Sequence, residues 1–134
     1  MEISEKRIED MDVLVLTGRL EASSAKKLKG QVDALVKEKR VKLIVDMAGV
    51  DFIDSSGLGS LVSSLRAVNE QKGDVKVASL QKQVRSIFEL TRLHRIFGIF
   101  DDVEAAIKSF WEAVRKNYPR NINYMPVVIF PGIP

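Results

Sequence analysis

Residues 41–68, VKLIVDMAGVDFIDSSGLGSLVSSLRAV, decide the fold of this chain. They begin with a short apolar run of strand length, Val41–Asp46, followed by an aspartate-rich segment at residues 49–54. Beyond the serine pair, apolar side chains recur at helical steps, at Leu58, Leu61, Val62, Leu65 and Val68. The pattern predicts a buried central strand, a loop over residues 49–54, and an amphipathic helix.

Strands and helices alternate on both sides of this stretch. Residues 13–17 are apolar and stop at Gly18, which predicts a strand, and Ile3–Ile8 predicts its antiparallel hairpin partner across a turn at residues 9–12. The other expected elements are a helix from Ser23, a strand at residues 75–78, a helix at 81–90, a short strand within 96–100 and a helix after Asp102. This order predicts an α/β fold with a mixed, mostly parallel sheet of four to five strands and about four helices packed mainly on one face.

Composition limits the class of protein. With 134 residues, 46% of them hydrophobic and 29% charged, the chain is typical of one globular domain. The absence of cysteine excludes disulfides, thiolate zinc sites and a cysteine nucleophile, and is compatible with the cytoplasm, where we expect the protein to act. A net charge of +3 does not predict nucleic-acid binding, and no apolar run predicts membrane insertion or a signal peptide.

The C-terminal residues differ from the rest of the chain. All four prolines and the apolar run Val127–Phe130 fall after Tyr118. We therefore expect one domain at residues 1–116 and a proline-containing tail at residues 117–134. Such a tail could dock on a sheet edge, pair with another chain, or stay loose.

The segment with the most unusual side chains joins the central strand to the following helix. In parallel sheets, binding sites lie at the carboxyl ends of the strands, where this segment is expected. We expect Ser55 to be the N-cap and Ser56 the first helical residue, so that a phosphate on Ser56 would meet the helix dipole and free N–H groups. Asp51 and Asp54 would repel that phosphate, which would then act mainly on a partner surface. In the competing interpretation, Asp54 and Ser55 only cap the helix, and Gly57 and Gly59 allow close packing.

The segment Val50–Gly59, VDFIDSSGLG, resembles the signature of the STAS domain, specifically that of bacterial anti-sigma factor antagonists, also called anti-anti-sigma factors. The resemblance extends from about Val13 to Phe110 and implies the STAS fold. In the family, the second serine of Asp-Ser-Ser-Gly is phosphorylated, which is Ser56 here, with Ser55 as second choice. The implied partner-binding residues are Glu21, Ser23, Asp51, Asp54, Ser55, Gly57, Leu58 and Gly59.

The resemblance also implies a mechanism and partners. The unphosphorylated form would bind an anti-sigma factor that is itself a serine kinase, and so release a sigma factor. Phosphorylation would block this binding, and a PP2C-type phosphatase would restore it. The protein would be no enzyme and would need neither cofactor nor metal. Three residues depart from the family pattern. Glu21 stands where many members have aspartate, and His94 stands in the place of an acidic residue. Arg92 stands where a glycine often ends the third helix and φ > 0 comes easily.

Other functions find less support in the sequence. A serine hydrolase would need a catalytic base, but the only histidine, His94, lies in a basic stretch and no Gly-x-Ser-x-Gly motif is present. The acidic residues at 101–104 are typical of a first helical turn without any metal. The runner-up is a non-switched STAS adaptor subunit of a transport ATPase or signalling assembly. Trp111 could mediate a homodimer or simply pack against the core.

Overall fold

The computed structural model describes residues 1–117, with side chains as far as Ala113. The elements are β1 (Glu2–Ile8), β2 (Met11–Leu20), α1 (Ala22–Lys37), β3 (Lys42–Ile53), α2 (Ser55–Glu70), β4 (Asp74–Ala78), α3 (Lys82–Leu90), the 3₁₀ turn η1 (Leu93–Arg95), β5 (Gly98–Phe100) and α4 (Val103–Asn117). The tail expected at residues 117–134, including Val127–Phe130, lies outside the described residues from Tyr118 onward.

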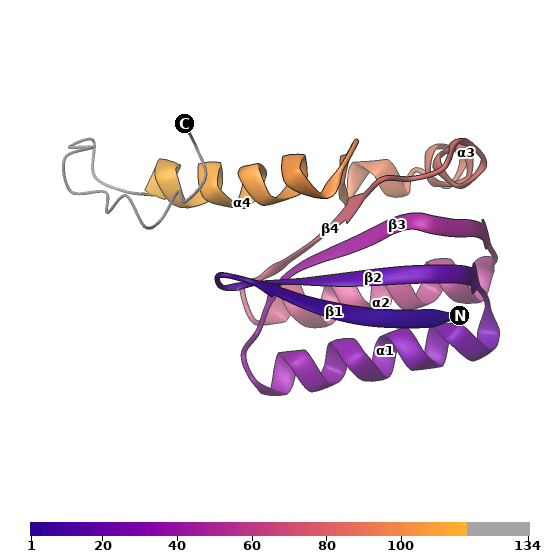
Figure 1. Cartoon of the computed structure of the whole chain (residues 1–134), viewed down its shortest axis with the longest axis horizontal. Helices are drawn as coiled ribbons and strands as arrows, with labels where there is room; N and C mark the ends of the chain where they lie inside the picture. The colour runs from indigo at the N-terminus through magenta and orange to yellow at the C-terminus, as the bar shows by residue number, and fades with distance from the viewer. Residues whose placement is uncertain (118–134) are drawn as a thin grey trace.

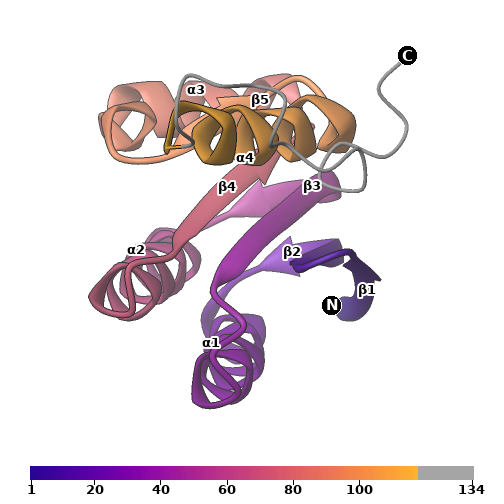
Figure 2. The same cartoon turned by 90° about the vertical axis from the view of Figure 1, so that its left-hand side faces the viewer.

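Five strands form one sheet in the order β1-β2-β3-β4-β5. The β1–β2 pair is antiparallel, and the three other pairs are parallel. Helices α1 and α2 lie side by side against one face, and α4 lies across the other (Figures 1 and 2). The predicted α/β class, with a mixed and mostly parallel sheet and four helices, is confirmed.

Each face of the sheet has its own apolar core, because alternate residues of a strand point to opposite sides. The larger core joins Leu14, Leu16 and their strand neighbours to the apolar stripes of α1 and α2, and α3 adds Val84 and Phe88 to it. The smaller core lies under α4, where Ala106, Ile107 and Phe110 pack against Met11, Val13, Ile44 and Ala78.

Two strands extend beyond their expected ends, so the predicted boundaries are wrong. β2 continues past Gly18 to Leu20, and β3 continues through the predicted loop at residues 49–54 as far as Ile53. The extensions pair with each other, because Thr17–Leu20 run alongside Gly49–Ile53 with irregular steps in register. On the other edge of β3, the side chains of Gln81 and Gln83 donate to the carbonyl oxygens of Ala48 and Asp51 at 2.8 and 3.3 Å.

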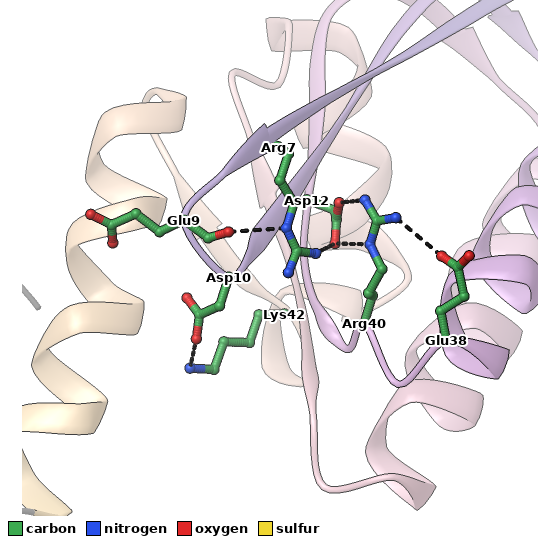
Figure 3. Close-up of polar contacts among 7 residues, drawn as sticks. All are labelled: Arg7, Glu9, Asp10, Asp12, Glu38, Arg40 and Lys42. Carbon is green, nitrogen blue, oxygen red and sulfur yellow. Dashed lines mark hydrogen bonds and ion pairs between the residues drawn. The ribbon is translucent and has the colours of Figure 1, made fainter.

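The hairpin turn is also shorter than expected, since it comprises only residues 9 and 10. Asp12, which was expected in the turn, is a fully buried residue of β2. Its carboxylate accepts hydrogen bonds from Arg7 at 2.6 Å and from two nitrogens of Arg40 (Figure 3). The hydrogen bond to Asp12 is the main cause that raises the pKa of Arg40 above its ordinary value. This cluster ties the β1–β2 hairpin to the α1–β3 connection, because a buried carboxylate needs such partners.

Candidate functional site

The candidate site lies at the opposite end of the sheet from Asp12, where β2 and β3 end. Leu20 and Ile53 are direct partners in the two strands. Helix α1 begins two residues after Leu20, and α2 begins two residues after Ile53. The two helices therefore start at the same level and present their N-termini side by side, as Figure 1 shows at the end of β2 and β3.

Asp54, rather than Ser55, is the N-cap of α2. Its carboxylate accepts a hydrogen bond from the backbone N–H of Gly57 at 2.9 Å. Ser55 and Ser56 are therefore the first and second helical residues, one step later than expected, and both are exposed. Aspartate and serine are equally good N-caps, so the end of β3 decides between them.

The two glycines of the serine loop differ in their surroundings. Gly57 is buried, and a Cβ atom there would lie 2.3 Å from the carbonyl oxygen of Leu20. Gly59 is exposed, and a Cβ atom there would have nothing within 4 Å. Close packing therefore requires glycine at residue 57 but not at residue 59. The tight contact at Gly57 fixes the start of α2 against the end of β2.

The start of α1 supplies the neighbouring surface. Glu21 is the N-cap residue of α1, and its backbone N–H donates to the Ser24 hydroxyl at 2.8 Å. The Glu21 carboxylate accepts a hydrogen bond from Arg19 Nε at 3.4 Å. Ser23 is exposed in the first turn of this helix. Glu21 and Ser23 thus lie at the same end of the sheet as the two serines of α2.

Arg19 and Phe52 complete the site, although the sequence did not single them out. They are cross-strand partners in β2 and β3, and the guanidinium carbon of Arg19 lies 3.9 Å from the centroid of the Phe52 ring. Phe52 is a large apolar residue that stays 36% exposed. Aromatic and arginine side chains are enriched among the residues that dominate binding at protein interfaces. The sequence carries no signal for this pair, because Phe52 and Ile53 are both apolar and only the structure distinguishes the exposed residue from the buried one.

The predicted partner-binding residues therefore meet at one end of the molecule but differ in exposure. Asp51, Ser55, Ser56, Gly59 and Ser23 are exposed, Glu21, Asp54 and Leu58 are half-buried, and Gly57 is buried. The exposed and half-buried members, together with Arg19 and Phe52, are called the serine-end surface below.

The described residues offer little support for a metal site, a membrane span or a catalytic histidine. No group of three histidine, aspartate or glutamate side chains within residues 1–113 could hold a metal ion. Asp102 instead caps the start of α4, because its carboxylate accepts from the N–H of Ala105 at 2.7 Å. Among the helices that the structure describes, none combines the length and the apolar character needed to cross a membrane. His94 is exposed in η1, where its ring lies 3.5 Å from the carbonyl oxygen of Phe88.

Comparisons with known proteins place this geometry in a family. The family model described as the STAS domain matches residues 2–106. The anti-sigma-B factor antagonist of Listeria monocytogenes is 26% identical over 99 residues, which are 74% of this chain and 86% of that protein.

Two solved structures share the architecture. TM1081 of Thermotoga maritima has a TM-score of 0.76 at 26% identity, over 80% of this chain and 92% of that one. The phosphorylated form of the Bacillus cell fate determinant SpoIIAA has a TM-score of 0.67 at 17% identity, over 81% of this chain and 99% of that one, and shares the fold. Since the family model spans most of the chain, this protein belongs to the STAS domain family.

Proposed function

We propose that this protein is an anti-sigma factor antagonist that works as a phosphorylation-controlled binding switch in the cytoplasm. Its unphosphorylated form binds an anti-sigma factor that is also a serine kinase, and this binding releases a sigma factor. Transfer of phosphate to Ser56 blocks the binding, and a PP2C-type phosphatase restores it. The protein acts by binding and catalyses no reaction itself.

The observation that carries this proposal is the position of Ser56. Its side chain is exposed in the first turn of α2, within a surface that also holds Arg19 and Phe52. A kinase can reach a hydroxyl there without unfolding the protein. The Asp54 cap and the close contact of Gly57 hold the backbone of this turn in place, so Ser56 has a defined position on the surface.

The same position explains how phosphate would block a partner. Phosphorylation adds a charge of about −1.5 to −2 at neutral pH. A partner that covers the serine-end surface must remove water from whatever lies there, and burying such a charge is costly unless cations match all of it. The added group therefore weakens binding even though the fold stays unchanged.

The functions given in the names of the relatives support this proposal. The anti-sigma-B factor antagonist of Listeria aligns over most of both chains, and SpoIIAA of Bacillus has been solved in a phosphorylated form. We infer the same function for this chain, with the Ser56 hydroxyl as the site of phosphorylation.

The two adjacent serines provide a matched test. We would incubate the protein with ATP and the candidate anti-sigma kinases of the same genome, and then measure intact mass. Ser56→Ala should abolish the addition of one phosphate, whereas Ser55→Ala, which removes the neighbouring exposed hydroxyl, should leave it intact.

The opposite pattern would assign the switch to Ser55. Failure of every candidate kinase to add phosphate, with the protein recovered in a transporter or signalling assembly, would favour the non-switched adaptor instead.

A further inference from the structure

A shallow, open groove of about 450 Å³ runs between α1 and α2, and Ser56 is one of its lining residues. From α2 it is lined by Ser56, Ser60 and Ser63, and from α1 by Lys26, Lys29 and Asp33. The two remaining lining residues are an alanine and a glycine of α1. Because most of these side chains are small, the groove leaves room for a group attached to Ser56.

The register of the two helices places Lys26 closer than Lys29 to Ser56 along the helix axis. Leu20 and Ile53 are paired, and each helix begins two residues later, so Ser56 is level with Ser23 on α1. Lys26 comes three residues after Ser23, which corresponds to about 4.5 Å along the helix axis. A lysine side chain spans this offset easily. Lys29 lies nearly one turn further from Ser56.

The charges in the groove also single out Lys26. Lys29 forms an ion pair with Asp33 on the next turn of α1. Within the part of the chain that the structure describes, no carboxylate pairs with Lys26. Among the acidic groups at this end, Asp54 already accepts from Gly57, and Glu21 accepts from Arg19. Asp51 is exposed on β3.

We propose that Lys26 holds the phosphate of phosphorylated Ser56 within the groove between α1 and α2. The ammonium group balances part of the added charge, so the phosphorylated form keeps its fold while its binding surface changes. This inference rests on the proposed function, because it presupposes that Ser56 carries phosphate.

The test does not depend on finding the kinase. Phosphoserine is incorporated at residue 56 during translation, and ³¹P NMR follows its phosphate through a pH titration. A nearby cation favours the dianion, so Lys26→Gln should raise the second pKa of the phosphate, ordinarily about 6, by about half a pH unit. Added salt should shrink this difference.

Lys27→Gln is the matched control. It removes the same charge one residue away, from a side chain outside the groove that donates to the carbonyl oxygen of Met1 at 3.3 Å. An effect confined to Lys26→Gln would support the inference. Equal effects of both variants, or none, would overturn it. The proposed function is tested separately, by whether a kinase adds phosphate to Ser56.

Discussion

At the scale of single residues, glycine has two different roles within one turn of α2. The backbone of β2 lies so close to Gly57 that no side chain fits, whereas Gly59 faces open space. Both residues belong to the same short motif, so the same role in close packing was expected of both. Their difference arises from the register of β2 against β3, which places the carbonyl oxygen of Leu20 beside Gly57.

We expect alanine at these two positions to have opposite effects on stability. Gly57→Ala should lower the free energy of unfolding by about 2–3 kcal/mol, because a methyl group would collide with the backbone of Leu20. Gly59→Ala should raise it by about 1 kcal/mol, because alanine favours a helix interior more than glycine does. Urea denaturation of both variants measures the two changes. A loss of stability in Gly59→Ala would contradict this assignment.

Lys76 is a second residue whose surroundings set its behaviour. Its side chain is 12% exposed, and its ammonium lies 4.5 Å from the ring centroid of Phe110 and 5.3 Å from that of Phe100. Burial lowers the pKa of Lys76 below its ordinary value of 10.5, although Asp74 and Glu112 act in the opposite direction. The folded protein therefore loses this proton at a lower pH than the unfolded chain does.

This difference predicts how stability changes with pH. In the window below pH 10.5 the unfolded chain holds more protons at Lys76, so the stability of the parent should rise with pH relative to Lys76→Met. The free energy of unfolding of both proteins between pH 8 and 10.5 tests this. Lys72→Met, at an exposed lysine nearby, controls for the loss of a positive charge. Parallel curves for the parent and Lys76→Met would contradict the prediction.

At the scale of elements, the apolar periodicity identified all four helices and the order of the strands. Apolar residues at helical steps along α1, namely Ala25, Leu28, Val32 and Leu35, are buried, and Val36 is half-buried. The sequence did not predict the end of β3, because glycine and aspartate within residues 49–54 are typical of a loop. The strand continues there because β2 pairs with one edge and Gln81 and Gln83 hydrogen-bond to the other.

That longer strand also explains what was missed in the site. Once β3 reaches Ile53, the next residue, Asp54, becomes the cap, and Phe52 becomes the cross-strand neighbour of Arg19. The same shift makes Ser56 the second helical residue rather than the first, and leaves it in the first turn. Residue types could indicate that the serines belong to the site, but only the pairing of β2 with β3 could place Arg19 and Phe52 beside them.

The end of α3 carries a backbone conformation that suits glycine. Arg92 has a φ of 62°, in the left-handed region, where the family resemblance had suggested that glycine would be at ease. Arg92→Gly should therefore raise the free energy of unfolding by about 0.5–1 kcal/mol. Arg95→Gly, at a residue of η1 without positive φ, should lower it by a similar amount. Thermal or urea denaturation compares the two, and a loss of stability in Arg92→Gly would refute the argument.

At the scale of the whole molecule, the buried Asp12 cluster and the proposed binding surface occupy opposite ends of the sheet. The buried Asp12 with Arg7 and Arg40 ties the elements together at the amino ends of β2 and β3. The serine-end surface lies at their carboxyl ends, where the exposed side chains contribute little to the stability of the fold. In the proposed switch, this separation would allow a phosphate on Ser56 to change the surface without unfolding the domain.

The measurement that tests the central claim most directly is the affinity of the protein for its anti-sigma partner, with and without phosphate on Ser56. We predict that phosphoserine at residue 56 raises the dissociation constant at least tenfold, since the phosphate must be desolvated at the interface. Ser56→Ala, which adds no charge, should bind about as tightly as the parent. Equal dissociation constants for the phosphorylated and unphosphorylated forms would contradict the switch.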